Sequence, residues 1–291
     1  MKVLLLGTAA GGGFPQWNCA CAMCGNPTLP PRTQDCIAIS ADGTNWYLIN
    51  ASPDIRAQIL ASKHLSAGPG PRDTPIRGAL LTDAELDHTL GLTMLREGAG
   101  LRIWAPAAVL RALNHDFPLR DIVSRYGAWD WQAVTTEFEV DGLRVTVIPI
   151  SDKKPKYTQS TVDGPWVVAY RIEDPAGGTL IYAPCLKTWP ENFDTLVSGT
   201  TCVILDGTFY SPTEMSTATT TVTSGAQHAM GHIPISGPHG SLTKIAAHPH
   251  TRWIYTHLNN TNPILDPNSP EYQEVLEGGA EAPPDGTELN L

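Results

Sequence analysis

The chain has 291 residues with 19 basic and 29 acidic side chains, which gives a formal net charge of −10. This acidic balance argues against nucleic acid as a partner, because phosphate binding needs clustered lysine and arginine. Apolar residues make up 42% of the chain, too many for intrinsic disorder, and no apolar run approaches the roughly 18 residues of a membrane span. The apolar run after Met1 is too short for a secretory signal, so we expect a globular protein of the cytoplasm that contacts no membrane.

Short apolar runs bounded by glycine, proline, aspartate or threonine predict β-strands, several of them buried on both faces. In chain order the predicted strands are residues 3–6, 36–40, 46–49, 79–81, 101–104, 143–150, 167–172, 180–183, 202–205 and 253–255. Helical patterns occur between them, at residues 55–61, 88–96, 106–113, 191–197, 241–247 and 271–276. This order indicates a mixed α/β fold with sheets inside and helices outside. Because none of the segments with a loop-like composition is long enough for a linker, we expect a single domain over residues 1–291.

A glycine-rich loop at residues 7–13 follows the first predicted strand. It lacks the lysine and hydroxyl residue of a phosphate-binding loop, since Gly12 is followed by Gly13 and Phe14. We interpret it as a tight turn at a sheet edge.

Three cysteines, Cys19, Cys21 and Cys24, fall within six residues. Thiolates at this spacing can bind one soft, tetrahedral cation, and zinc is the usual one in a reducing compartment. Three ligands leave one position open, so the spacing alone does not decide between a structural and a catalytic site. The remaining alternative is three unligated thiols.

Three acidic side chains, Asp83, Glu85 and Asp87, alternate along the segment after the strand at residues 79–81, and His88 follows them. Alternate side chains of an extended segment share a face, where carboxylates repel one another unless a cation or solvent holds them. Taken alone, the segment is equally an acidic, solvated turn with Asp87 as a helix N-cap.

Polar side chains recur at later strand ends. Asp206 ends one predicted strand, His257 ends another, and His232 lies in the loop between them. Carboxylates and histidines at the carboxyl ends of neighbouring strands are common in functional sites. They favour a functional interpretation of the segment around Asp87.

The pattern Asp-x-x-x-Asp-His after a strand, with a glycine-rich first loop and a distal Thr-His, resembles the metallo-β-lactamase superfamily, whose signature is His-x-His-x-Asp-His. More specifically, the chain is similar to the coenzyme PQQ (pyrroloquinoline quinone) synthesis protein B family. The similar segments are residues 6–21, 50–56, 87–92, 95–98, 206–208, 230–232 and 257–263. The resemblance implies an αββα sandwich, metallo-β-lactamase-like, with a metal site at one edge between the sheets.

On this resemblance, Asp83 and Glu85 stand at the positions of the two signature histidines, and Asp87 and His88 at those of the Asp-His pair. The ligands that survive are Asp87, His88 and His257. One carboxylate and two imidazoles with open positions are the ligand set of non-haem Fe(II) oxygenases. We therefore predict Fe(II) on these three residues, with Glu85 and Asp83 bound to the metal or supporting its ligands.

The resemblance implies an iron- and O2-dependent hydroxylase, an oxidoreductase, that acts on a tyrosine ring in a small amino-acid-derived intermediate of PQQ synthesis. His232 and Asp206 are the predicted catalytic residues, with His232 as an acid or base for ring protons. Cys19, Cys21 and Cys24 are predicted to bind a structural zinc, as in the family. The implied partners are the substrate and O2, and a homodimer is among the assemblies that the sequence allows.

Two other functions stay open at this point. A metal-dependent hydrolase of the superfamily would use its metal to generate hydroxide from water. A PQQ carrier would keep the fold without catalysis.

The segment at residues 151–160 departs from the family, in which a histidine usually follows the preceding strand. It carries Lys153, Lys154 and Lys156 instead. If the segment covers the site, its ammonium groups would meet a substrate carboxylate. The alternative is a solvated basic loop.

Overall fold

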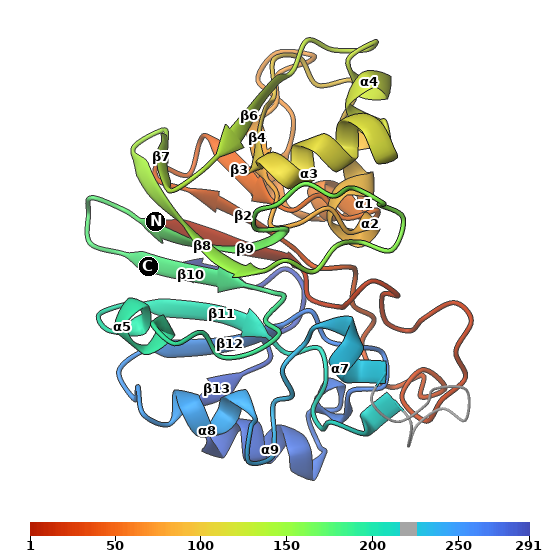
Figure 1. The fold of residues 1–291 in the computed structure, drawn as a ribbon, viewed down its shortest axis with the longest axis vertical. Helices are drawn as coiled ribbons and strands as arrows, with labels where there is room; N and C mark the ends of the chain where they lie inside the picture. Colours follow the sequence, from red (N-terminus) through yellow and green to blue (C-terminus); the bar gives the residue numbers. More distant parts are fainter. Residues whose placement is uncertain (216–225) are drawn as a thin grey trace. The chain divides into compact units, whose positions relative to one another are not determined.

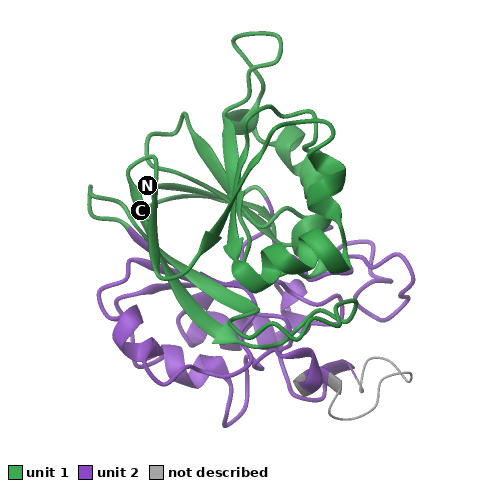
Figure 2. Cartoon of the chain, turned by 45° about the horizontal axis from the view of Figure 1, so that its top comes forward, with its two compact units in different colours: residues 1–7, 35–178, 286–291 green, residues 8–34, 179–285 purple. Residues whose placement is uncertain are grey.

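The computed structural model describes residues 1–215 and 226–291 (Figure 1). They form two compact units, which Figure 2 shows in different colours. Unit 1 comprises residues 1–7, 35–178 and 286–291, and unit 2 takes its residues from 8–34 and 179–285. The prediction of a single domain stays a prediction. In the two described ranges, no helix is long and apolar enough to cross a membrane.

Unit 1 contains a seven-stranded sheet in the order β14-β1-β2-β3-β4-β5-β6. Its strands are β1 (Lys2–Gly7), β2 (Cys36–Ser40), β3 (Trp46–Ile49), β4 (Ile76–Leu80), β5 (Arg102–Pro106), β6 (Asp130–Val134) and β14 (Glu288–Asn290). The pairs β14–β1, β1–β2 and β2–β3 are antiparallel, whereas β3, β4, β5 and β6 run parallel. Strands β2 and β3 are buried along their whole length, which explains their continuous apolar sequence.

Unit 1 also contains an antiparallel meander of β7 (Glu137–Val140), β8 (Leu143–Ser151) and β9 (Val167–Glu173). Its helical segments are α1 (Ile55–Ala61), η1 (Lys63–Leu65), α2 (Leu86–Thr89), η2 (Leu90–Thr93), α3 (Ala107–Arg111), η3 (Ala112–Asp116) and α4 (Leu119–Val123). Figure 1 shows α1 to α4 gathered beside the sheet of β2 to β6. The core of the unit joins the two layers, with Leu48 and Ile103 from the sheet and Ile55 and Val109 from the helices.

In its described residues, unit 2 contains four parallel strands, β10 (Thr179–Ala183), β11 (Cys202–Asp206), β12 (Arg252–Thr256) and β13 (Ala280–Glu281). Its helical segments are α5 (Phe193–Val197), α7 (Ala226–Met230), α8 (Ser241–Ile245), η4 (Pro263–Leu265) and α9 (Pro270–Glu277). Asp206 pairs with Thr256 in the register of β11 and β12. The parallel pairing therefore brings Asp206 beside the strand end from which His257 follows.

Every strand predicted from the sequence corresponds to a strand of the structure, with ends that differ by at most about three residues. The structure adds β6, β7, β13 and β14. Strand β6 was not predicted because most of its side chains are at least partly exposed, so its sequence lacks an apolar run.

The helix predicted over residues 88–96 is wrong in its bounds. Helix α2 begins at Leu86 and ends at Thr89, and a 3-10 turn follows. The Gly91 N–H donates to the Ala51 carbonyl at 2.9 Å, and a Cβ on Gly91 would lie 2.1 Å from the Ser52 carbonyl oxygen. The chain packs so tightly on this backbone that a regular helix does not continue. Glu85 takes the N-cap position, and Asp87 lies inside the helix rather than at its cap.

Candidate functional site

A buried carboxylate–imidazole pair follows β4 in unit 1. The two carboxylate oxygens of Asp83 lie 2.9 and 2.8 Å from His88 Nδ1. Burial opposes a charge on the imidazole, but Asp83 and Asp87 outweigh it and raise the pKa of His88 to about 10. Burial also opposes ionisation of Asp83, and the adjacent His88 outweighs it and lowers the pKa of that carboxyl. Asp83 therefore holds His88 Nδ1 and fixes the orientation of the ring.

Asp87 and the second ring nitrogen of His88 form a donor pair. Asp87 Oδ2 lies 3.9 Å from His88 Nε2. Metal bonds to carboxylate oxygen and histidine nitrogen are about 2.0–2.2 Å long, so one divalent ion can bridge atoms at this separation after a small adjustment. A carboxylate on the opposite nitrogen is the usual support of a metal-bound histidine. The residues present at this end of β4 thus fit a divalent metal.

A chain of buried hydrogen bonds fixes this pair. Asn50, with a left-handed φ of 65°, accepts hydrogen bonds from the Thr82 N–H at 3.0 Å and the Thr82 hydroxyl at 3.1 Å. Thr82 Oγ1 lies 2.8 Å from Asp83 Oδ2, and the Ala51 N–H donates to the carbonyl of His88 at 2.7 Å. Asparagine is among the few residues that adopt this backbone conformation readily. Asn50 was not among the predicted site residues, although it lies in a segment that is similar to the family.

Glu85 pairs with a lysine, whereas Asp83 and Asp87 lie beside His88. Its Oε1 lies 3.3 Å from Lys153 Nζ, and both side chains are about 30% exposed. The loop of Lys153 is attached to the same segment by Tyr157, whose hydroxyl donates to the carbonyl of Ala84 at 2.7 Å. Metal ligation by Asp83 and Glu85 stays a prediction, and their contacts favour supporting roles.

Unit 2 brings together Asp206, His232 and His257, whose potential ligand atoms all lie within 4.8 Å of one another. Asp206 Oδ2 lies 2.7 Å from His232 Nδ1, and Asp206 Oδ1 accepts from the Thr208 hydroxyl at 2.7 Å. The same hydroxyl lies 2.8 Å from His257 Nδ1. Thr208 therefore connects the carboxylate to the second histidine. Thr208 was not among the predicted site residues.

These contacts set the electrostatics of the cluster. Asp206 is fully buried, which opposes its ionisation, but the charge and hydrogen bond of His232 outweigh burial and lower its pKa. The rings of His232 and His257 are nearly parallel, with centroids 5.2 Å apart. His257 has a φ of 58°, a strained conformation that is typical of functional sites. With Nδ1 of each ring bonded to Asp206 or Thr208, Nε2 is the nitrogen that each can offer to a metal or a proton.

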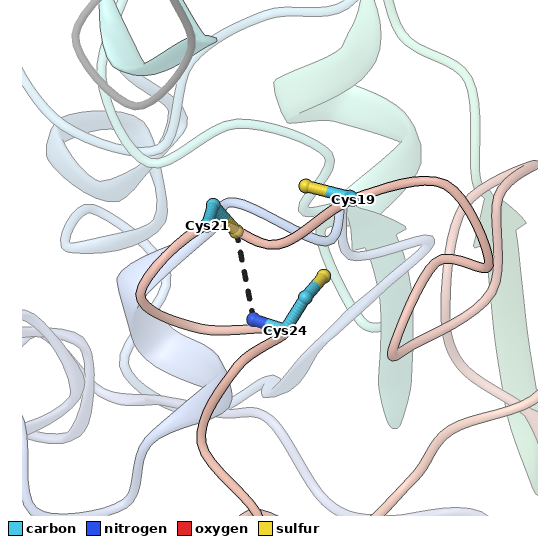
Figure 3. Close-up of side chains that lie close together, drawn as sticks. All are labelled: Cys19, Cys21 and Cys24. Carbon is cyan, nitrogen blue, oxygen red and sulfur yellow. Dashed lines mark hydrogen bonds between the residues drawn. The ribbon is translucent and has the colours of Figure 1, made fainter.

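The loop of Cys19, Cys21 and Cys24 brings three sulfur atoms within 4.8 Å of one another (Figure 3). Burial opposes ionisation of Cys21, but backbone N–H groups and neighbouring thiols lower its pKa. Cys21 Sγ and Cys24 Sγ each lie 3.8 Å from the carbonyl oxygen of Asn260. Thiolates bound to one tetrahedral zinc at about 2.3 Å are separated by a little under 4 Å, so the cluster fits this ion.

Glu214 is a buried acid that sequence reasoning did not single out. It is 7% exposed and accepts hydrogen bonds from the Tyr210 N–H at 2.6 Å and from the Thr261 hydroxyl at 2.6 Å. No sequence pattern around Glu214 indicates a functional residue. Burial among neutral partners raises its pKa to about 7. It joins the segment after β11 to the loop after His257.

Comparison with known proteins shows which family the chain belongs to. A family model described as a beta-lactamase superfamily domain matches residues 45–258. The coenzyme PQQ synthesis protein B of Pseudomonas putida strain KT2440 is 39% identical over 306 aligned residues, with both chains covered completely, and that of Pseudomonas aeruginosa strain UCBPP-PA14 is 38% identical over 309. The chain belongs to the coenzyme PQQ synthesis protein B family.

A solved member of the coenzyme PQQ synthesis protein B family supports the same assignment. The structure of zinc-bound PqqB from Methylobacterium extorquens matches with a TM-score of 0.92 and 35% identity, and covers both chains completely. A diphosphatase of the PhnP family, at 19% identity and a TM-score of 0.71, and human tRNase Z short form, at 15% and 0.61, share the fold. Each covers 96% or more of both chains. These matches confirm the predicted α/β, metallo-β-lactamase-like fold.

Proposed function

We propose that this chain is a non-haem, iron- and O2-dependent hydroxylase of PQQ biosynthesis that acts on a tyrosine ring in a small amino-acid-derived intermediate. Its family supports the place in PQQ synthesis. The observation that carries the metal chemistry is the Asp87–His88 pair, in which Asp83 holds one ring nitrogen and the other lies 3.9 Å from a carboxylate oxygen.

The proposed ligand set is Asp87, His88 and His257. His257 rests on the sequence and on its Thr208 hydrogen bond, which fixes the ring by Nδ1. One carboxylate and two imidazoles suit Fe(II) and leave positions open for other ligands. When bound, a ferrous ion supplies O2 activation. Zinc, which the Methylobacterium extorquens relative binds, is assigned here to the three cysteines.

Asp206 and His232 supply the proton chemistry in this proposal. Hydroxylation replaces a ring C–H bond by C–O, so the ring must lose a proton. Asp206 stays ionised, holds His232 by Nδ1 at 2.7 Å and directs Nε2 as the base. A carboxylate that orients a catalytic histidine in this way also stabilises the protonated ring.

The test is metal loading under exclusion of oxygen. Protein prepared with zinc only should hold about one zinc per chain, and should consume O2 with a tyrosine-containing substrate only after Fe(II) is added. A His257→Ala variant should retain the zinc and lose the oxygen consumption.

A metal-dependent hydrolase is the second candidate, and the fold shared with a diphosphatase and a tRNase favours it. It predicts cleavage of a phosphodiester with zinc alone and no oxygen consumption, which would contradict the hydroxylase. A PQQ carrier without catalysis predicts that the His257→Ala variant still supports PQQ synthesis in a strain that lacks the wild-type gene.

A further inference from the structure

Lys153 places a positive charge beside the proposed metal pair of unit 1. Its Nζ lies 3.3 Å from Oε1 of Glu85, the N-cap residue of the helix that carries Asp87 and His88. The two side chains are 30% and 31% exposed. An ion pair this open to water adds little to stability and can exchange its partner. The ammonium is therefore accessible to a ligand that approaches the acidic segment.

The loop that carries Lys153 is held firmly at this position. The Tyr157 hydroxyl donates to the carbonyl of Ala84 at 2.7 Å, and its ring lies 5.8 Å from that of Phe117. Pro155, between Lys153 and Tyr157, is buried. Because these contacts fix the backbone around it, Lys153 presents its charge from a defined place rather than from a mobile loop.

The other two lysines of the loop have different surroundings. Lys154 Nζ donates to the carbonyl of Ser160 at 2.8 Å and lies 5.7 Å from the ring centre of Trp166. Lys156 is exposed. Of the three, Lys153 is the one whose ammonium faces the acidic segment.

We infer that Lys153 is a substrate-binding residue that takes a carboxylate of an amino-acid-like substrate and so holds its ring near Asp87 and His88. The inference rests on the proposed function. A carboxylate that approaches Asp83, Glu85 and Asp87 is repelled, and an ammonium at the same place offsets this repulsion. Glu85 holds Lys153 until the substrate carboxylate replaces it as the partner. The substrate class is thus an anionic, carboxylate-bearing phenol.

A pair of small probes tests this without iron or oxygen. L-Tyrosine and tyramine share the ring and the amine, and only L-tyrosine has a carboxylate. Calorimetric titration of the full chain under argon should show L-tyrosine binding at least about tenfold more tightly, since a charge-assisted hydrogen bond that is partly exposed to water contributes about this factor. Lys153→Met should abolish the preference, Lys153→Arg should keep most of it, and Lys156→Met serves as the matched control.

Three results would overturn the inference. The first is equal affinity of the wild-type chain for the two probes, or no binding of either probe up to about 10 mM; either outcome would show that there is no carboxylate-binding site. The second is an equal loss of affinity for both probes in Lys153→Met, which would show that Lys153 only stabilises the loop. The third is weaker L-tyrosine binding in Glu85→Gln. If the substrate carboxylate replaces Glu85 as the partner of Lys153, this variant should instead bind L-tyrosine severalfold more tightly. Because no readout needs turnover, failure of the hydroxylase proposal would leave these results interpretable.

Discussion

At the scale of single residues, the site depends on buried carboxylates that fix histidine rings. Asp83 and His88 form the clearest case, because each shifts the pKa of the other in the direction that keeps both charged. In the described part of unit 2, His232 lowers the pKa of Asp206, whose Oδ2 lies 2.7 Å from His232 Nδ1. Both pairs engage Nδ1 and leave Nε2 for chemistry.

Asp83→Asn tests the first of these pairs. Asparagine keeps the shape but loses the charge that orients His88, so we expect divalent metal binding at Asp87 and His88 to weaken by about 10–100-fold. Titration with Co(II), followed by its absorption spectrum, measures this. Asp121→Asn, on the exposed side of α4, is the control. Unchanged Co(II) affinity in Asp83→Asn would contradict the supporting role.

Glu214→Gln tests the buried acid of unit 2. Its pKa rises on folding to about 7, so the folded chain binds the proton more tightly than the unfolded chain. The contribution of the Glu214 carboxyl to the free energy of unfolding is therefore fully present below the unfolded pKa near 4.5. It is lost as the pH rises through about 7. Relative to wild type, Glu214→Gln should gain about 2–3 kcal/mol in free energy of unfolding between about pH 5 and about pH 8.

Urea unfolding at both pH values measures this difference. Glu277→Gln, at an exposed position of α9, should show no such change. A constant difference between Glu214→Gln and wild type across this range would show that Glu214 does not titrate there.

At the scale of elements, Gly91 decides how α2 presents His88. Alanine would place its Cβ 2.1 Å from the Ser52 carbonyl oxygen, so either the turn at Gly91 or the backbone at Ser52 must move. Gly91→Ala should lower the free energy of unfolding by about 1–3 kcal/mol and weaken Co(II) binding. In Gly100→Ala no atom lies within 4 Å of the added Cβ, and only the positive φ costs stability, about 1–2 kcal/mol, with metal binding unchanged. Equal Co(II) affinity in both variants would contradict this account of α2.

The elements also show what a sequence can and cannot predict. Strands such as β2 and β11 are fully buried, so their apolar runs identify them directly. Edge strand β6 has no such run. The end of α2 depends on contact between Gly91 and a distant backbone, which no local pattern contains. The same holds for the site: Asp206, His232 and His257 stand out as polar residues near strand ends, whereas Thr208 becomes visible only through its hydrogen bonds.

At the scale of the whole molecule, the cysteine loop is connected to the segment that follows His257. Cys21 and Cys24 contact Asn260, three residues after that histidine. Cys24→Ser should release the bound zinc and lower the Tm, because a structural zinc contributes directly to folding. Metal analysis after dialysis against a chelator and thermal unfolding measure both effects. Ala22→Ser, at an exposed position in the same loop, should change neither, and retained zinc in Cys24→Ser would contradict the proposed site.

The proposed hydroxylase is tested most directly by the source of the new oxygen atom. The iron-loaded chain is incubated with a tyrosine-containing substrate, a reductant and ¹⁸O-labelled O2, and the product ring is analysed by mass spectrometry. The account predicts one labelled hydroxyl oxygen on the ring, with the second oxygen atom of O2 reduced to water. Label that enters only from ¹⁸O-labelled water, or a ring that stays unmodified while a phosphodiester is cleaved, would contradict it.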